Sequence, residues 1–453
     1  MRDVAVYGSD LLTSVEFSLI LLALSLAGRG LADITILTVG SRGDVQPFCA
    51  IALGLMQAGH SVTLASSPNF ADFAAQWNIP FAPIAGDFQA LLSSSVGLDL
   101  LEGNSKAELI EEDLRWQQLL NAWDACQGSD IIVFSPLTTW GYHLAEALKI
   151  PGILATQVPV SATRAFPFLG FARRCDQWLQ GWANLFSYRL VGFLFWRRSA
   201  KVINRFRQDV LGLSKLPWLG AQYRRDAPSQ LSPLPVLNCF SSAVIPPALD
   251  WDDSVHQGGY CFLDTSKSFT PSVALQDFLI EDPKPLYIGF GSMIPRHPEK
   301  LAQMIVSAIE ETKQRAVLCS GWGNIKQTDL PSSIFLAESV PHDWLFPRVA
   351  AAIHHGGAGT TAATLRAGIP SVVVPFFADQ PVWGELLEQI GVSPATYPQM
   401  TLTCEQLTDG IRRVVEQDEF GERARWVRSQ IMTEDGVTKA VSMIESCLQD
   451  FDG

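Results

Sequence analysis

The chain of 453 residues lacks the cysteine patterns that identify zinc-binding and disulfide-rich proteins. Its eight cysteines are dispersed, with no CxxC pair and no cysteine–histidine cluster at zinc spacing. Neither a zinc module nor a disulfide framework is therefore expected. Cysteines used in this way are typical of a reducing compartment, and we expect the protein to be cytoplasmic.

A comfortable membrane span is also missing near the N-terminus. The apolar run over residues 17–27 is only eleven residues long, whereas about 20 are needed to cross a bilayer. The charge of Arg2 is cancelled by Asp3, which argues against a signal peptide. We interpret residues 1–33 as an apolar N-terminal extension. A membrane anchor, a loose extension and a start codon placed too early are alternatives that stay open.

The composition that is present predicts a large α/β protein. A chain of this length is expected to divide into about two domains, and 47% hydrophobic residues supply enough apolar surface for two cores. The formal net charge is −13, so the chain as a whole is acidic.

A glycine-rich turn over residues 353–361, Ile-His-His-Gly-Gly-Ala-Gly-Thr-Thr, is the most informative segment. An apolar run at 349–353 predicts a strand before it, and a helix-forming run at 361–367 follows, closed by Gly368. Glycines let a backbone approach its ligand closely, and the N–H groups that begin a helix attract anions. The turn lacks both the GxGxxG and the Walker A form. It therefore predicts a phosphate site of another kind.

A second segment, residues 375–384, begins where the next expected strand, 369–375, ends. Asp379 and Gln380 then lie at the carboxyl edge of the sheet, where open α/β sheets bind ligands. An acid beside an amide suits a polyhydroxylated ligand, and Trp383 offers a flat apolar face beside them.

With residues 340–347, these segments resemble the donor-binding signature of sterol 3-beta-glucosyltransferases in the UDP-glycosyltransferase superfamily. The signature covers about 45 residues, and a thinner resemblance extends from residue 34 to about 435. It implies two facing Rossmann-like α/β domains, the GT-B glycosyltransferase architecture. The implied parts are an acceptor domain, a linker, a donor domain and a C-terminal helix that returns to the first domain: 34–263, 264–284, 285–430 and 431–453.

The resemblance also implies the donor-binding residues. His354 matches a histidine that contacts the diphosphate, Ser292 a second phosphate contact, and Val340 the segment that contacts the base. Plant relatives stack the base on a Trp where this chain has Ser339, so the choice between UDP and dTDP stays open. The remaining expected contacts are the phosphate turn, the pair that binds sugar hydroxyls, and two residues that flank the donor: Gly357, Ala358, Gly359, Thr360, Asp379, Gln380, Gly43 and His342.

The N-terminal half carries a matching βαβ unit. A strand at 33–40 is followed by a turn at 41–46, and Pro47 is expected to be the first helical residue. The resemblance implies that Asp44 in this turn is the general base. Position alone would also suit a residue that caps the helix. We expect a strand at 235–240 to be the last of this domain.

Basic residues gather in one window of this acidic chain. Residues 164–225 contain twelve Lys and Arg against two Asp, which gives +10 and leaves −23 for the remainder. Interleaved Trp and Phe side chains predict peripheral contact with a membrane of anionic lipids. An ordinary surface helix with core aromatics is the main alternative, and we expect no nucleic-acid partner.

These observations predict an inverting transfer of glucose from UDP-glucose to a hydroxyl of a sterol or similar lipophilic alcohol. Asp-x-Asp, which holds metals in other transferases, is absent from the βα turns, so no metal or cofactor is expected. Asp250–Asp252 and Asp450–Asp452 are interpreted as solvated loop and tail. The alternatives are a polyketide or carotenoid glycosyltransferase using a UDP- or dTDP-hexose, a nucleotide-sugar epimerase, and a non-catalytic lipid-binding protein.

Overall fold

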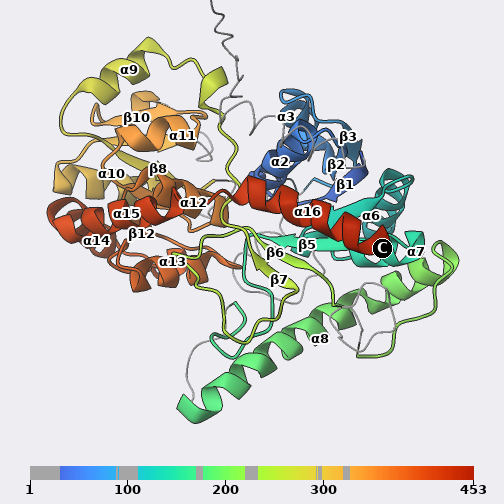
Figure 1. The fold of residues 1–453 in the computed structure, drawn as a ribbon. Coiled ribbons are helices and arrows are strands. Elements are labelled where there is room, and N and C mark those ends of the chain that lie inside the picture. The colour runs from blue at the N-terminus through green and yellow to red at the C-terminus, as the bar shows by residue number, and fades with distance from the viewer. Residues whose placement is uncertain are drawn as a thin grey trace, which may run out of the picture.

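The computed structural model describes residues 31–87, 90, 111–169, 177–219, 233–291, 293, 298–319 and 327–452. Two parallel sheets form two α/β domains that lie beside each other (Figure 1). The first sheet has the order β3-β2-β1-β4-β5-β6-β7. Its strands are β1 Asp33–Leu37, β2 Ser61–Ser66, β3 Phe81–Pro83, β4 Ile131–Phe134, β5 Gly152–Thr156, β6 Val236–Asn238 and β7 Val255–Gln257.

The second sheet has the order β10-β9-β8-β11-β12. Its strands are β8 Leu286–Gly289, β9 Ala316–Cys319, β10 Ile334–Ala337, β11 Ala352–His354 and β12 Ser371–Val373. The chain reverses its direction across the sheet between β1 and β4 in the first domain, and between β8 and β11 in the second. Ligands of doubly wound sheets bind at such switch points, outside the carboxyl ends of the strands.

Helices cover both faces of each sheet. In the first domain they are α2 Arg42–Gln57, α3 Ala71–Ala75, α6 Glu112–Ala125, α7 Gly141–Leu148 and α8 Gln177–Asp209. In the second they are α9 Val273–Ile280, α10 Pro298–Thr312, α11 His342–Leu345, α12 Ala358–Ala367, α13 Gln380–Gln389, α14 Cys404–Glu416 and α15 Asp418–Ile431. Strands covered on both faces are apolar throughout, and β4, which reads Ile-Ile-Val-Phe, is wholly buried.

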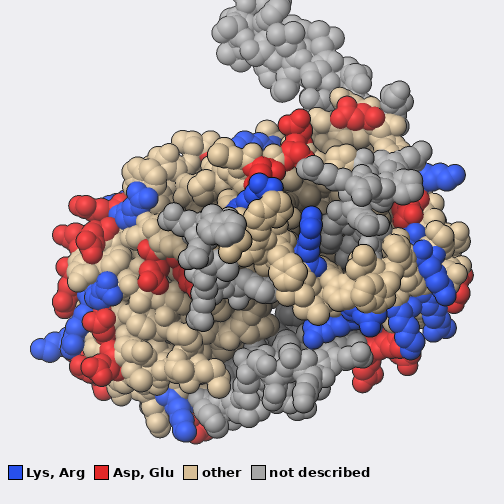
Figure 2. Space-filling model, turned by 90° about the horizontal axis from the view of Figure 1, so that it is seen from below, with Lys and Arg blue, Asp and Glu red and all other residues tan. Residues whose placement is uncertain are grey.

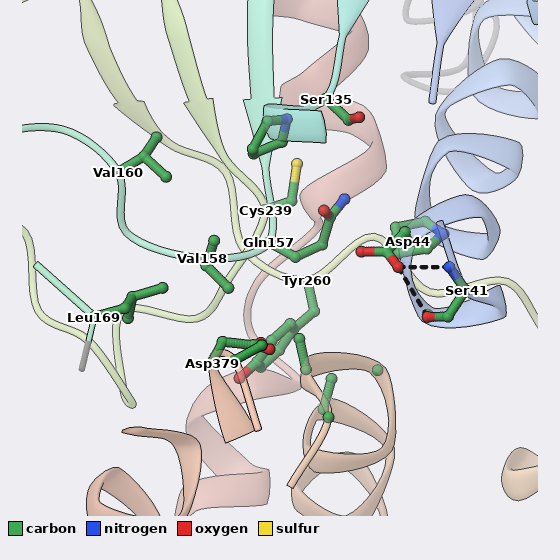
Figure 3. Close-up of a pocket in the computed structure, with 18 of the residues that line it drawn as sticks. Ser41, Asp44, Ser135, Gln157, Val158, Val160, Leu169, Cys239, Tyr260 and Asp379 are labelled. Atoms are coloured by element: carbon green, nitrogen blue, oxygen red, sulfur yellow. Dashed lines mark hydrogen bonds between the residues drawn. The ribbon is translucent and has the colours of Figure 1, made fainter. Parts of the chain in front are cut away.

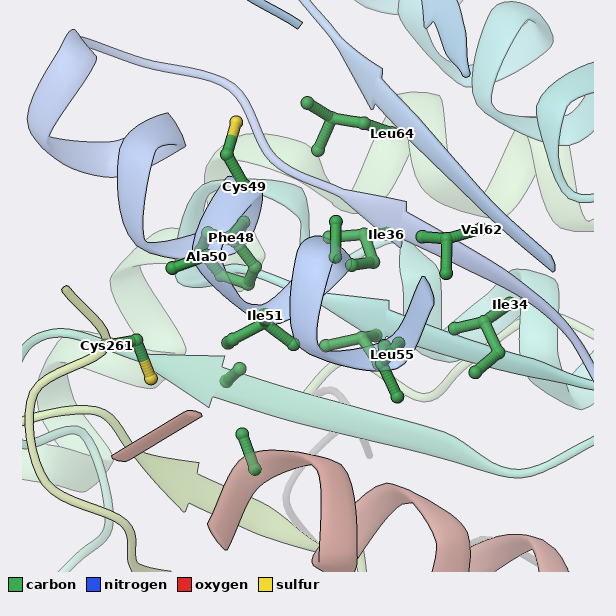
Figure 4. Close-up of a cluster of buried hydrophobic side chains, with 14 of the residues drawn as sticks. Ile34, Ile36, Phe48, Cys49, Ala50, Ile51, Leu55, Val62, Leu64 and Cys261 are labelled. Atoms are coloured by element: carbon green, nitrogen blue, oxygen red, sulfur yellow. The ribbon is translucent and has the colours of Figure 1, made fainter. Parts of the chain in front are cut away.

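The core beneath α2 shows how the pattern of the sequence becomes packing. Ile34 and Ile36 point from β1 to the same side of the sheet because alternate strand residues share a face. Phe48, Ile51 and Leu55, at helical spacing, meet them from α2 (Figure 4).

The last helix, α16 Gly436–Asp452, packs on α2 of the first domain (Figure 1). Gly54 of α2 makes the close approach possible, because a Cβ there would lie 2.5 Å from Cγ1 of Val437. Ala440 and Ile444 of α16 are fully buried in the core of the first domain. The chain thus ties its C-terminus to the domain that contains its N-terminal sheet.

Three local expectations need correction. The first helix starts at Arg42 rather than Pro47, because Ser41 and Asp44 form a capping box that sets the start earlier and leaves Pro47 inside the helix. The first sheet continues past residues 235–240, since β7 pairs with β6 in parallel. Residues 264–284 contain the helix α9, whose N-cap Ser272 accepts a hydrogen bond from the Leu275 N–H.

Candidate active site

A cleft of about 3070 Å³ lies between the domains and is lined by both of them. Pockets for single small ligands are typically about 300–1000 Å³, so this cleft has room for two substrates together. Asp44 reaches it from the start of α2, and Asp379 from the start of α13 on the facing domain (Figure 3). The carboxyl edges of both sheets therefore meet in one space.

Asp44 is held in place by the residue that begins its own helix. Its Oδ2 accepts hydrogen bonds from the Ser41 backbone N–H at 2.7 Å and from the Ser41 hydroxyl at 2.8 Å (Figure 3). Among the described residues, Oδ1 accepts no hydrogen bond, so it remains available to a ligand in the cleft. The carboxylate is at once a helix cap and a group that faces the cleft.

Gly40 makes this arrangement possible. Its φ of +133° is a conformation that L residues rarely adopt, and a Cβ at this position would lie 2.5 Å from Oδ2 of Asp44. Sequence reasoning did not assign a role to Gly40 or to the Ser41 side chain. A glycine directly before a Ser-x-x-Asp capping box is the signal that could have identified them.

Burial raises the pKa of Asp44 above its usual value, because the charged form loses its hydration in the cleft. The hydrogen bonds from Ser41 stabilise the charged form and oppose this rise. A carboxylate with a raised pKa binds a proton more strongly, and is a better general base near neutral pH than a solvated one.

The facing domain presents the start of α12. Gly357 is its N-cap and contributes no side chain, so the first backbone N–H groups of the helix are not capped by it. Gly359 lies directly opposite Gly43 of α2, since a Cβ on Gly359 would lie 3.3 Å from the Gly43 Cα. Ala358 and Thr360 line the cleft on either side. Two helix N-termini with positive partial charge thus converge on one point.

The structure brings His355 rather than His354 into the cleft. His354 is the last residue of β11, is fully buried, and accepts a hydrogen bond from the Gly356 N–H at its Nδ1. Burial, followed by the neighbouring His355, holds its pKa well below the usual value. His354 does not line the cleft, because the last residue of the strand packs inside the sheet and the first loop residue reaches its edge. Its Nε2 is buried without a hydrogen-bond partner among the described residues, and its contact with the diphosphate stays a prediction.

His355 lines the cleft, and its Nδ1 is buried without a hydrogen-bond partner among the described residues. A Cβ on Gly357 would clash with Nε2 of this ring, which explains why the turn needs a glycine at that position. Burial lowers the pKa of His355 to about 4, against the opposing effect of a hydrogen bond with the Gly289 backbone. The ring is therefore neutral at pH 7.

Asp379 faces the cleft from the N-cap position of α13. Its Oδ2 accepts a hydrogen bond from the indole N–H of Trp383 at 2.8 Å. Trp383 is 1% exposed, so it fixes Asp379 from the core and offers no stacking face in the cleft, contrary to the expectation. Burial and then the charge of Asp44 raise the pKa of Asp379 to about 6. The two acids thus interact across the cleft.

Gln380 lines the cleft beside Asp379, but its amide is largely committed. Oε1 accepts from the backbone N–H groups of Phe376 and Phe377, and Nε2 donates to the sulfur of Met293 at 3.4 Å. These bonds fix the loop that presents Asp379. The second N–H of the amide is the part that remains for a ligand.

At the other end of the donor half, Val340 and His342 line the cleft as expected. His342 stacks on Phe346 with the ring centroids 4.4 Å apart, and its Nε2 lies 3.1 Å from the Tyr287 hydroxyl. Burial, and then the charge of Arg42, lower the pKa of His342 to about 4. Ser292, the expected second phosphate contact, lies outside the described residues.

Apolar side chains dominate the wall that the first domain contributes. They come from the loop after β5, from α8 and from the segments around β6, and include Val158, Val160, Leu169, Leu185, Tyr188, Val191, Phe193 and Leu234. Asp250, expected to be a solvated loop residue, accepts bonds from the Thr163 hydroxyl at 2.5 Å and the Arg164 N–H at 2.8 Å. It fastens the loop after β5 to the rim of this wall.

Family models match two parts of the chain. The glycosyltransferase family 28 N-terminal domain matches residues 34–167, and the erythromycin biosynthesis protein CIII-like C-terminal domain matches residues 317–446. The first match contains Asp44, and the second contains the phosphate turn and Asp379.

Curated relatives match nearly the whole chain. The sterol 3-beta-glucosyltransferases of Cryptococcus neoformans and Vanderwaltozyma polyspora are both 36% identical to it, over 437 and 435 residues. Each match covers 91% of this chain, but only 27% and 34% of the relative. The chain therefore spans about a third or less of the length of these relatives.

Among solved structures, the glycosyltransferase of kitacinnamycin has a similar fold, with a TM-score of 0.64 and 17% identity. The similarity covers 92% of this chain and 100% of that one, so both domains and their order are shared. The predicted two-domain α/β architecture is confirmed. The chain belongs to the UDP-glycosyltransferase superfamily and has its GT-B fold.

Proposed function

We propose that the protein transfers glucose from UDP-glucose to the hydroxyl of a sterol, with inversion at the anomeric carbon. The observation that carries the proposal is the position of Asp44 opposite the glycine turn of the second domain: it is a partly buried carboxylate whose Oδ1 accepts no hydrogen bond from the described residues. The similarity to sterol 3-beta-glucosyltransferases supports the choice of donor and acceptor.

The acceptor alcohol is a poor nucleophile until a base takes its proton. Oδ1 of Asp44 accepts that proton as the oxygen attacks the anomeric carbon from the face opposite the leaving group. The raised pKa of Asp44 favours the proton transfer. Ser41 holds the carboxylate in one orientation, so little reorganisation is needed in the transition state.

The leaving diphosphate gains negative charge as its bond to glucose breaks. The N-terminal N–H groups of α12, the Thr360 hydroxyl and the neutral ring of His355 line the cleft where they stabilise this charge. Asp379, fixed by Trp383, accepts hydrogen bonds from the sugar hydroxyls. These groups bind the donor to the second domain, with its anomeric carbon facing Asp44.

Replacing Asp44 by Asn tests the assignment of the base. An amide cannot take the proton, so we expect the rate of transfer to fall about 10²–10⁴-fold while UDP-glucose binding, measured by calorimetry, is kept. Asp435→Asn is the matched control. Its carboxylate also caps a helix, accepting from the Thr438 N–H and hydroxyl, but does not line the cleft. Near-normal transfer by Asp44→Asn, or an equal loss in both variants, would contradict the proposal.

We also propose that the protein works at a membrane surface, through a stripe on α8. Leu179, Trp182 and Phe186 lie at helical spacing on one face, and these side chains are 41%, 63% and 63% exposed. The stripe continues through Arg189 and Arg197. The N-terminal half of α8 lies clear of both sheets (Figure 1). No helix in the described part of the chain is long and apolar enough to cross a bilayer.

The other aromatic residues of this helix are divided between core and surface. Tyr188, Trp196 and Phe206 are buried, as an ordinary surface helix would have them. Trp218, 65% exposed, packs against Phe193 and lies beneath Arg197, which extends the apolar stripe sideways. Only some of the aromatic residues between 164 and 225 therefore pack in the core.

Several of the basic residues on α8 are already neutralised. Arg207 pairs with Glu146 and Lys201 with Glu112. Arg189, Arg197 and Arg198 are exposed, and the structure shows no carboxylate partner for them in the described part of the chain. Arg173 and Arg174, and Arg224 and Arg225, lie outside the described residues. Lys and Arg gather at one end of this side of the molecule (Figure 2). Cations beside exposed aromatics suit anionic headgroups.

Vesicle co-sedimentation tests the stripe. We expect binding to phosphatidylserine vesicles that weakens with salt, and a loss of roughly tenfold in Trp182→Ser, because a large apolar side chain no longer inserts. Trp426→Ser is the matched control. Trp426 is 47% exposed on α15 and lies beneath Arg423, as Trp182 lies beneath Arg164. Equal binding by wild type and Trp182→Ser would contradict the proposal.

A further inference from the structure

The amide nitrogen of Gln157 is a buried polar atom that no part of the proposed chemistry uses. Gln157 follows directly after β5 and lines the cleft. Its Nε2 is buried and makes no hydrogen bond to any described residue. Buried polar groups are nearly always paired, so an orphan amide that faces a substrate cleft points to a partner supplied by the substrate.

The topology of the sheet brings this amide near the base. The carboxyl ends of β1, β4 and β5 lie in that order along one edge, with Leu37 in register with Phe134 and Phe134 with Leu154. Adjacent strands are about 4.8 Å apart, so the ends of β1 and β5 are separated by about 10 Å. Side chains that extend into the cleft from the ends of β1 and β5 can therefore both contact one hydroxyl group of a ligand.

The surroundings of Gln157 assign it to the acceptor rather than to the donor. It belongs to the first domain, and Val158 and Val160, which follow it, extend the apolar wall of the cleft (Figure 3). Figure 3 shows the Gln157 side chain between Val158 and Asp44, with Asp379 of the donor domain below them in this view. Ser135, at the end of the intervening strand β4, pairs its hydroxyl with Thr138.

We propose that Gln157 is a positioning residue that donates a hydrogen bond from Nε2 to the oxygen of the acceptor hydroxyl. That oxygen donates its own proton to Asp44 and still has a lone pair for the amide. The hydroxyl thus donates one hydrogen bond to Asp44 and accepts another from Gln157, and together these bonds fix the direction of its O–H bond. The attacking lone pair then points at the anomeric carbon. This inference rests on the proposed function.

A comparison of acceptors with and without the hydroxyl isolates this contact. We expect Gln157→Leu to lower kcat/KM for the sterol by roughly 10–100-fold, the usual effect of losing one hydrogen bond to a buried polar group. KM for UDP-glucose and the slow hydrolysis of UDP-glucose without acceptor are expected to change by less than about threefold. With UDP bound, the preference for the sterol over its 3-deoxy analogue is expected to fall by about tenfold.

Gln46→Leu is the matched control, because this glutamine lines the same cleft with both ends of its amide paired. Its Oε1 accepts from Arg42 and its Nε2 donates to the Leu263 carbonyl. The preference for the hydroxyl is expected to stay at the wild-type value in this variant. Gln157→Glu, which keeps the size of the side chain but removes the donor, is expected to lose the preference like Gln157→Leu.

The outcomes separate the two proposals. Sterol transfer by the wild type with an unchanged hydroxyl preference in Gln157→Leu would overturn the role of Gln157 alone. A rise in KM for UDP-glucose without a change for the sterol would assign Gln157 to the donor and overturn the proposal as well. Absence of sterol binding in the wild type would overturn both this inference and the proposed function.

Discussion

Replacing Gly40 by Ala would disturb the candidate base without touching it chemically. The new methyl group would lie 2.5 Å from Oδ2 of Asp44 and 2.8 Å from its Cγ, so the carboxylate has to leave its bonds with Ser41. The positive φ of Gly40 costs a further 1–3 kcal/mol or so in a residue with a Cβ. With the lost cap, we expect the free energy of unfolding to fall by about 2–4 kcal/mol.

The effect on catalysis follows from the displacement. Moving a catalytic group by about 1 Å typically costs about 10²-fold in rate, so kcat for sterol glucosylation is expected to fall by that factor. Gly128→Ala is the matched control, because Gly128 has φ +79° and a Cβ there would meet nothing within 4 Å. It carries backbone strain alone, and its kcat is expected to change by less than about threefold.

Urea unfolding and initial rates of UDP release with sterol vesicles measure the two effects separately. Full activity in Gly40→Ala would refute the reasoning, because it would show that the bonds between Ser41 and Asp44 do not position the base. An equal loss of activity in Gly128→Ala would refute it too, since backbone strain far from the cleft would then explain the result.

Three further predictions follow from charged and polar groups. Burial raises the pKa of Asp379 from its usual 3.8 to about 6, so the cost of its charge develops as pH rises between these two values and is complete above pH 6. Asp379→Asn should increase the unfolding free energy by up to about 3 kcal/mol at pH 7.5 but by less than about 1 kcal/mol at pH 4, and equal effects at both values would contradict this. His355→Ala should weaken UDP binding by roughly tenfold in calorimetry, whereas unchanged affinity would remove this ring from the diphosphate site. Arg207→Met leaves Glu146 without its partner and should lower the unfolding free energy by about 2–4 kcal/mol. The double variant Arg207→Met/Glu146→Leu should recover most of this stability, and no recovery would contradict the pairing.

The local chemistry of the site was readable from the sequence because it depends on short segments. The glycine turn, the start of α12 and the position of Asp379 follow from neighbouring residues, and the structure places them in one cleft. That His355 would line the cleft could not be predicted from the sequence, since the register of β11 against β8 and β12 decides which residue is the last inside the sheet.

Features that depend on contacts across the fold were also out of reach. The start of α2 follows from the reciprocal bonds of Ser41 and Asp44, which outweighed the preference of Pro47 for the first helical position. The unpaired amide nitrogen of Gln157 is visible only once its surroundings show that no partner for it is present among the described residues. The split of the α8 aromatics between core and surface likewise depends on where the helix leaves the first domain.

The most direct test of the proposed sterol glucosylation is the release of UDP from UDP-glucose by the purified protein, with vesicles that do or do not carry a sterol. We expect release that depends on the sterol and yields one steryl glucoside of inverted configuration for each UDP, with dTDP-glucose as a poorer donor. Absence of both release and binding of any nucleotide sugar would contradict the proposal.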